Sequence, residues 1–140
     1  MHESILRDFF LGKAGAKALS KDIEASIAAI SPPGAPYSKT SEGIVKMDSE
    51  FNLSRANLLT LCDAFLSGGL SAVDLECIAF ALIASDGFNW DGDQDNTLAE
   101  IINDWAAPQI NYPLNVENIQ RCRRWLEGTE EYPDRPGLAS

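Results

Sequence analysis

The residues best suited to chemistry are carboxylates that gather between positions 86 and 104, with no Lys or Arg among them. Alternating aspartates at Asp91, Asp93 and Asp95 resemble the start of an EF-hand calcium loop, in which carboxylate oxygens coordinate the ion. Counted from Asp91, the sixth position is Asn96 instead of the turn-forming glycine, and the twelfth is Ile102 instead of a bidentate glutamate. We therefore expect no metal site, and weak cation binding by the loop from Asp91 to Asp95 is kept only as an alternative.

The same segment is typical of a surface that recognises a basic protein. Its carboxylates can meet Lys or Arg on a partner, and two aromatic residues can anchor the contact inside a charged rim. The alternative is a helix N-terminus rich in Asp to suit the helix dipole, with both aromatics in the core. The predicted partner-binding residues are Asp86, Phe88, Trp90, Asp91, Asp93, Asp95, Glu100 and Asp104, with Asp74 and Glu76 as flanking support.

The charge of the chain is unevenly distributed along its 140 residues, and its net value is -10. Between Ala56 and Gln120 there is no Lys or Arg but there are ten acidic residues, so the rest of the chain is neutral. Such a field repels nucleic acid and anionic membranes and attracts basic proteins. We therefore predict a basic protein partner, no nucleic acid and no membrane, whereas an acidic surface kept for solubility is the alternative.

The chain offers little for catalysis. Its single histidine, His2, lies at a terminus that we expect to fray, so a Ser or Cys nucleophile has no base to activate it. The carboxylates lie beside polar and glycine-rich residues, which favour solvation and not the raised pKa of a general acid. No nucleotide-binding or hydrolase motif occurs. We expect no enzyme and no cofactor.

The three cysteines, Cys62, Cys77 and Cys122, form no CxxC pair, which disfavours a metal cluster or a disulfide framework. They are expected to be core thiols in a reducing cytoplasm. The apolar run from 77 to 84 is shorter than the roughly 20 residues that cross a bilayer, and the first residues do not resemble a secretion signal. A cytoplasmic location is therefore expected.

Apolar residues at helical spacing predict the elements that must position these acids. The expected helices cover residues 5–10, a stretch from a Ser20 cap to about 30, 54–66, 71–83, 97–107 and 115–127. Capping boxes start two of them, Ser71 with Asp74 and Thr97 with Glu100, and Gly128 ends the last. The helix behind Ser71 is apolar nearly all round, so it is the candidate for the central buried helix.

The predicted fold class is all-α, with five to six helices in antiparallel hairpins forming a compact bundle. One long loop covers 31–52, in which only the segment from Ile44 to Met47 could pair briefly as a strand. Residues 1–128 are expected to form a single helical domain, followed by a loose C-terminal tail at 129–140.

One stretch resembles a known family. The segment Leu6-Arg-Asp-Phe-Phe-Leu-Gly-Lys13, followed by a second helix, resembles the opening of the colicin D type of bacterial immunity proteins. The stretch from Leu61 to Gly68 resembles the same opening segment. The resemblance implies a small acidic helical protein whose carboxylates cover the basic active site of a tRNA-cleaving toxin in place of the RNA backbone. The chain departs from that type by its segment at 31–52 and by an extra C-terminal helix.

The leading hypothesis is an immunity protein or comparable acidic inhibitor that binds and blocks a basic bacterial toxin, with a nuclease as the first choice. Reversal of charge at Asp91 or Asp93 should then abolish inhibition without unfolding the protein. The alternative is a helical adaptor or self-associating module whose contact surrounds Phe80, which would produce homo-oligomers.

Overall fold

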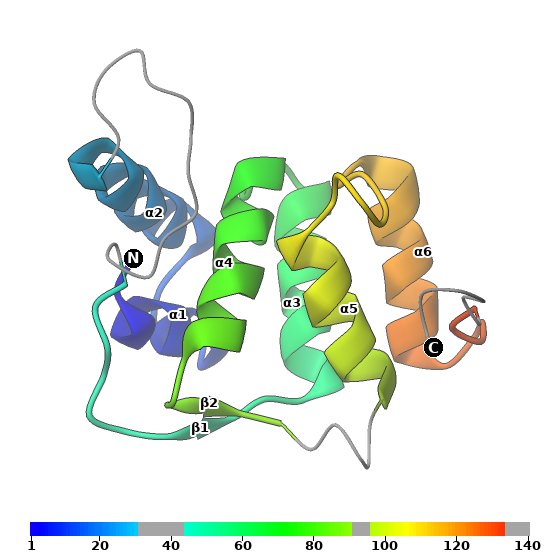
Figure 1. Cartoon of the computed structure of the whole chain (residues 1–140), viewed down its shortest axis with the longest axis horizontal. Coiled ribbons are helices and arrows are strands. Elements are labelled where there is room, and N and C mark those ends of the chain that lie inside the picture. The colour runs from blue at the N-terminus through cyan, green and yellow to red at the C-terminus, as the bar shows by residue number, and fades with distance from the viewer. Residues whose placement is uncertain (31–43, 91–95, 134–140) are drawn as a thin grey trace.

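The computed structural model describes residues 1–30, 44–90 and 96–133, and this part of the chain is mostly helical (Figure 1). The all-α prediction is confirmed, and the described residues add only a two-stranded sheet. The elements are α1 (Glu3–Phe10), α2 (Ala16–Ile30), β1 (Phe51–Asn52), α3 (Arg55–Leu66), α4 (Ala72–Ala84), β2 (Phe88–Asn89), α5 (Asn96–Ala106) and α6 (Val116–Glu127).

Helices α3 to α6 form a bundle in which each helix runs antiparallel to the next one along the chain (Figure 1). The most extensive contacts join α4 to α5 and α3 to α6, and α2 packs on α1 and on α4. The bundle therefore closes through α3 and α6, which are far apart in sequence. Consecutive hairpins alone would not have predicted that pairing.

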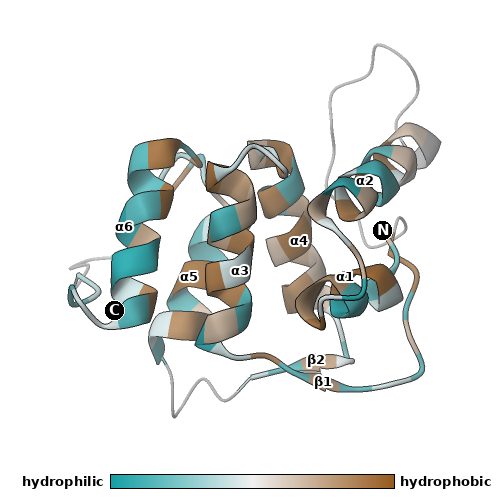
Figure 2. Cartoon of the chain, turned by 180° about the vertical axis from the view of Figure 1, so that it is seen from behind, coloured by the Kyte–Doolittle hydropathy of each residue, from teal (hydrophilic) through white to brown (hydrophobic). Residues whose placement is uncertain are grey.

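Helix α4 has the central position that its composition predicted. It contacts α2, α3 and α5, and its buried side chains include Leu75, Ile78 and Leu82, which have no exposed surface. Its ribbon is mostly apolar, whereas that of α6 is mostly polar (Figure 2). Helix α6 accordingly buries only one face, on which Ile119 and Trp125 lie. The number of apolar faces on each helix thus decides how many neighbouring helices it can pack against.

Local capping signals start and end several helices as predicted. Ser71 and Asp74 form the capping box of α4, Asn115 caps α6, and Gly128 ends α6 with a φ of 78°. Two predicted caps are wrong. Ser20 lies inside α2, which begins at Ala16, and Thr97 lies inside α5, which begins at Asn96. Serine and threonine also occur inside helices, where their hydroxyls can bond elsewhere, so the pattern by itself is ambiguous.

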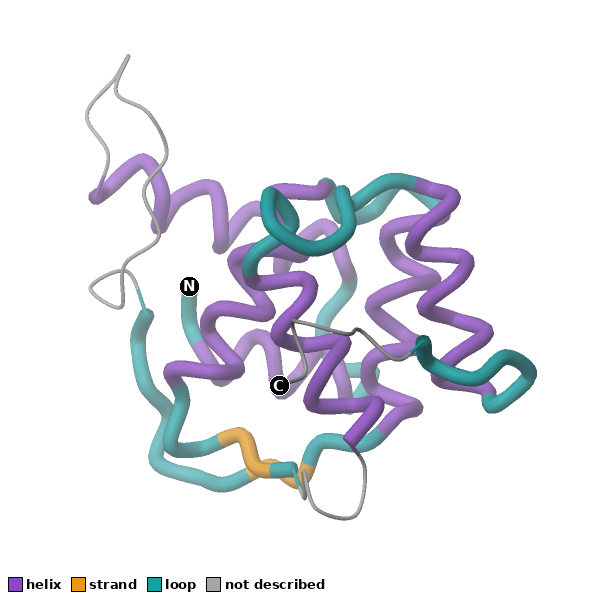
Figure 3. The backbone as a smooth tube through the Cα atoms, turned by 45° about the vertical axis from the view of Figure 1, so that its right-hand side comes forward, coloured by secondary structure: helices purple, strands orange, loops and turns teal. Residues whose placement is uncertain are grey.

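The short sheet lies beneath the lower ends of the helices (Figure 3). Strands β1 and β2 are parallel, with Phe51 opposite Phe88 and Asn52 opposite Asn89. Phe10 of α1 stacks on Phe51 at a centroid distance of 5.6 Å, so the sheet covers an aromatic cluster. The predicted strand pairing between 44 and 47 is reduced to one bridge, between Val45 and His2. Residues 31–43 of the predicted loop lie outside the described part of the chain.

Both ends of the described chain are packed. The backbone N–H of His2 donates to Asp22 Oδ2 at 2.6 Å, and its ring nitrogen Nδ1 lies 2.7 Å from Asp22 Oδ1. The expectation that His2 frays is therefore wrong. At the other end, Tyr132 packs edge-on against Trp125 at 4.8 Å, so packing continues past the tail boundary expected at 128. None of the described helices has the length and apolarity needed to span a bilayer.

Candidate functional site

The predicted binding residues that the structure describes come from elements at opposite ends of the bundle, and Figure 1 shows these two ends. We call the end that carries β1 and β2 the sheet end, and the end that carries the α3–α4 turn and the α5–α6 connection the turn end. Asp86 follows α4 at the sheet end, whereas Asp74 and Glu76 lie near the start of α4 at the turn end. A helix of 13 residues is about 20 Å long. The members of the predicted group that lie in the described part of the chain therefore do not form one surface.

Asp74 is a structural residue in the interior. The residue is 3% exposed, and its carboxylate accepts hydrogen bonds from the Ser71 N–H at 2.9 Å and the Ser20 hydroxyl at 2.8 Å. These bonds hold the start of α4 against α2. The prediction that Asp74 flanks a binding surface is therefore wrong, because its carboxylate caps a helix instead of facing solvent.

Asp104 and Phe88 are also buried, with 3% of each residue exposed. Asp104 accepts a hydrogen bond from the Tyr132 hydroxyl at 2.7 Å. Phe88 meets Phe10 edge-on at 6.1 Å, in the aromatic cluster above the sheet. Neither residue can contact a partner in this conformation, and we remove both from the predicted surface. Sequence spacing alone cannot separate an exposed acid from one that a distant hydroxyl satisfies.

The other predicted residues lie at or near the surface. Asp86 is exposed, and Trp90, Glu76 and Glu100 are half-buried. Trp90 packs against the core while part of its surface stays open, as an aromatic anchor requires. Asp91, Asp93 and Asp95 lie outside the described residues, between Trp90 and the start of α5. The binding role of this group stays a prediction.

Two further exposed acids, which no sequence pattern indicated, lie on the segment that runs alongside Asp86. The Phe51 N–H donates to the Gly87 carbonyl at 2.7 Å, so the segment that enters β1 runs alongside the segment that enters β2. Asp48 and Glu50 on that segment are exposed. We call Asp48, Glu50 and Asp86 the acidic edge. The charges between residues 31 and 52 are mixed, so the sequence does not indicate an acidic surface there. The pairing of β1 with β2, which brings these acids beside Asp86, is a tertiary contact without a local sequence signal.

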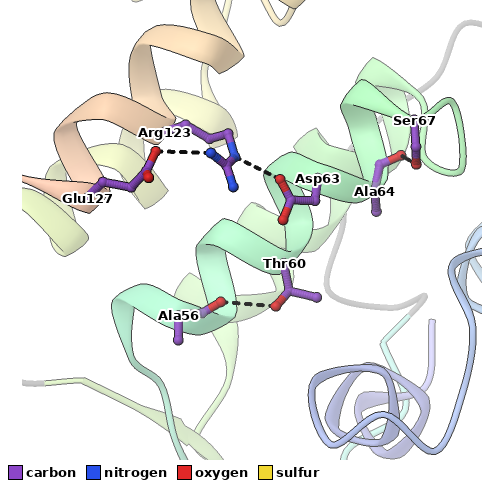
Figure 4. A network of polar contacts seen from close by, with 7 residues as sticks. All are labelled: Ala56, Thr60, Asp63, Ala64, Ser67, Arg123 and Glu127. Atoms are coloured by element: carbon purple, nitrogen blue, oxygen red, sulfur yellow. Dashed lines mark hydrogen bonds and ion pairs between the residues drawn. The ribbon is translucent and has the colours of Figure 1, made fainter. Parts of the chain in front are cut away.

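Basic side chains from outside the acidic half reach some of its carboxylates. Lys46 Nζ lies 3.2 Å from Asp86 Oδ2, and both side chains are largely exposed. Arg123 of α6 donates to Asp63 of α3 at 2.7 Å and to Glu127 at 3.0 Å (Figure 4). The hydrogen bond with Asp63 raises the pKa of Arg123. The negative charge of the stretch without Lys or Arg is thus partly neutralised by basic side chains from other segments. An exposed ion pair such as that of Lys46 with Asp86 contributes little to stability.

The thiols fit a structural role. Cys62 and Cys122 are buried, Cys77 is half-buried, and none of the three is in a disulfide bond. Burial raises the pKa of the Cys62 thiol, which disfavours the nucleophilic thiolate. Within residues 1–30, 44–90 and 96–133, no group of three or more His, Cys, Asp or Glu side chains is arranged to hold a metal ion.

Comparison with known proteins adds no family to this geometry: no family model, no curated protein and no solved structure matches the chain.

Proposed function

We propose that this chain is an immunity protein or comparable acidic inhibitor that binds a basic toxin, a nuclease in the first instance, and blocks its active site. The observation that supports the proposal is the acidic edge, where Asp48, Glu50 and Asp86 are exposed on two paired segments. The sequence continues from Trp90 into Asp91, Asp93 and Asp95, which adds three carboxylates to the same stretch. In this proposal the chain is not an enzyme, acts in the cytoplasm and uses no cofactor.

The backbone of the acidic edge is held in place before any partner binds. The Leu53 N–H donates to the Asn89 carbonyl at 2.7 Å, which complements the bond between Phe51 and Gly87. Beneath the two segments, Phe51 and Phe88 pack against each other at 5.8 Å. A preorganised surface loses less conformational entropy on binding, so more of the interaction free energy appears as affinity.

The chemistry of the edge is suited to the active site of a nuclease. Such a site holds phosphate groups with Lys and Arg, and carboxylates form charge-assisted hydrogen bonds with the same side chains. The edge pairs one of its carboxylates with Lys46 but keeps a net negative charge, which speeds the encounter with a partner of opposite charge, and salt weakens this effect. The expected complex is therefore a heterocomplex whose association rate falls with ionic strength.

The test compares two double variants that change the net charge equally. Asp48→Lys with Glu50→Lys reverses two of the three carboxylates of the acidic edge, whereas Glu24→Lys with Glu131→Lys reverses two exposed acids elsewhere. Proteins captured at low salt from a lysate of the host by the wild-type chain and by both variants are identified by mass spectrometry. The purified captured protein is then assayed for nuclease activity and for its inhibition by each variant.

We expect one basic protein that the wild type and the control capture and inhibit, and that the acidic-edge variant neither captures nor inhibits. The affinity for it should fall by at least about a hundredfold on reversal of the edge, because close charge pairs across interfaces couple by several kcal/mol. Equal inhibition by the edge variant and the wild type would refute the proposal, as would a partner whose activity the chain leaves unchanged.

Neither alternative function has an observation that favours it over the proposal. Phe80 is half-buried on α4, on the helix face that also carries the exposed Val73 and Ile83, so self-association through this face stays an alternative. Cation binding would depend on Asp91, Asp93 and Asp95, which lie outside the described residues. An unchanged melting temperature at millimolar calcium would reject it.

A further inference from the structure

A groove of about 580 Å³ lies at the turn end, between the start of α4 and the α5–α6 connection at 107–115. Side chains of both elements line it, and among them are Ala72, Val73, Glu76, Pro108, Pro113 and Leu114. The volume is in the range of sites that bury a ligand group or a few side chains of a partner. The groove is at the opposite end of the bundle from the acidic edge.

Both walls of the groove are held rigidly. On one side, the capping box of Ser71 and Asp74 fixes the first turn of α4. On the other, the amide of Asn118 donates to the Pro113 carbonyl at 2.9 Å, and the amide of Asn111 donates to the Ala107 carbonyl at 3.1 Å. Prolines restrict the backbone of this connection further. The groove is therefore preformed and needs little ordering to accept a ligand.

Apolar side chains stand exposed around the groove. Val73 on its wall is 46% exposed, Ile110 at the turn of the connection is 73% exposed, and Val116 at the start of α6 is 55% exposed. Single exposed aliphatic residues are ordinary, but Val73 stands on the wall of an apolar groove, Ile110 belongs to the connection that forms the other wall, and Val116 directly follows that connection.

The charge at this end identifies the chemistry of the occupant. The lining carries the carboxylate of Glu76, and Glu117 is exposed in the first turn of α6. The sequence holds no Lys or Arg between Ala56 and Gln120, which includes every residue that lines the groove. An apolar groove whose lining holds one carboxylate and neither Lys nor Arg is complementary to a ligand that presents an apolar group beside a cation.

We propose that this groove binds a segment of a basic partner protein in which an aliphatic or aromatic side chain is closely followed by Lys or Arg. The apolar side chain lies between Val73 and the prolines of the connection, and the cation meets Glu76. The site does not depend on the acidic edge, so it stands whether or not the partner of that edge is a toxin.

The test uses a phage-displayed library of random dodecapeptides, selected against the full chain. Peptides that are enriched are synthesised, and their dissociation constants are measured by fluorescence anisotropy. Val73→Asn tests the apolar wall, and Ile83→Asn is its control, because Ile83 is 45% exposed on the same helix at the sheet end. Glu76→Gln tests the charge, with Glu24→Gln on α2 as its control.

We expect enriched peptides that share an apolar residue within a few positions of Lys or Arg. Val73→Asn should raise their dissociation constant about tenfold or more, which corresponds to about 1.4 kcal/mol, whereas Ile83→Asn should leave it unchanged. Glu76→Gln should raise the dissociation constant and make it less dependent on salt concentration, whereas Glu24→Gln should change neither. A circular dichroism melt confirms that each variant is folded.

Three results would overturn the proposal. One is a selection that enriches no peptide or only peptides without a basic residue. Another is equal loss of binding in Ile83→Asn and Val73→Asn. The third is a homodimer in sedimentation equilibrium that Val73→Asn dissociates, since a second copy of the chain would then be the occupant.

Discussion

Two buried carboxylates of the bundle, those of Asp74 and Asp104, accept hydrogen bonds from hydroxyl groups that come from distant parts of the sequence. Asp74 takes a hydrogen bond from Ser20, which is 54 residues away, and Asp104 takes one from Tyr132, which is 28 residues away. An acid that is buried without a partner would cost several kcal/mol, so these hydroxyls make its burial tolerable. Each bond also ties a peripheral element, α2 or the segment after α6, to the central bundle.

The buried thiol of Cys62 predicts how stability depends on pH. Burial raises its pKa above the ordinary value of 9.0, so the folded state keeps the proton at a pH where the unfolded state releases it. Below about pH 9 both states are protonated and the thiol has no effect. Above about pH 9 the free energy of unfolding should fall by up to about 1.4 kcal/mol per pH unit because of this group.

Urea denaturation at pH 8 and at pH 10.5 measures this contribution in the wild type and in Cys62→Ala. We expect the decline with pH to be smaller in Cys62→Ala. Identical declines in the wild type and in Cys62→Ala would contradict the prediction.

At the scale of elements, the packing of α2 against the bundle depends on one glycine in the α3–α4 turn. A Cβ added at Gly69 would lie 2.9 Å from the Cβ of Ala16, the first residue of α2, and 3.4 Å from the Ala64 carbonyl oxygen. A Cβ of Ala16 is attached directly to the backbone and cannot swing away. The start of α2 approaches the turn this closely only because residue 69 has no side chain.

The variant Gly69→Ala should therefore lower the free energy of unfolding by about 1 to 3 kcal/mol, the usual cost of overpacking. Gly15→Ala is the matched control, because a Cβ there meets nothing within 4 Å, and it should be neutral or slightly stabilising. The double variant Gly69→Ala with Ala16→Gly should recover part of the loss. Urea denaturation of the four proteins measures these differences, and a Gly69→Ala variant as stable as the Gly15→Ala control would disprove the steric argument.

At the scale of the whole molecule, a net charge of -10 on 140 residues creates repulsion that opposes folding. Salt screens this repulsion, since the Debye length shortens from about 30 Å at 0.01 M to about 10 Å at 0.1 M. Exposed ion pairs such as that of Lys46 with Asp86 lose little on screening. We therefore expect the urea midpoint to rise between 10 and 200 mM sodium chloride.

The variant Asp48→Lys with Glu50→Lys provides the comparison, because two reversals change the net charge from -10 to -6. Its urea midpoint should rise less with salt than that of the wild type. A midpoint that falls with salt in the wild type would show that attractive pairs outweigh repulsion in the folded state.

The sequence alone determined the helices, because the interactions that specify them are local. Leu58, Leu61 and Cys62 recur at the spacing of one helix face, and all three are buried on α3. The capping box at Ser71 and the glycine at 128 likewise start and end a helix through contacts with residues only a few positions away. Both are observed where they were predicted. The central position of α4 was also predicted from the sequence, because this helix is apolar on nearly all sides.

Only the tertiary structure decided which acids face solvent. The pairing of α3 with α6, the parallel register of Phe51 with Phe88, and the bonds that bury Asp74 and Asp104 all join residues that are far apart in the chain. The sequence pattern around an acidic residue does not indicate whether its carboxylate accepts hydrogen bonds from a distant hydroxyl or extends into water. The acidic half was therefore visible as composition, whereas the acidic edge and the groove at the turn end depend on contacts between segments that no local pattern specifies.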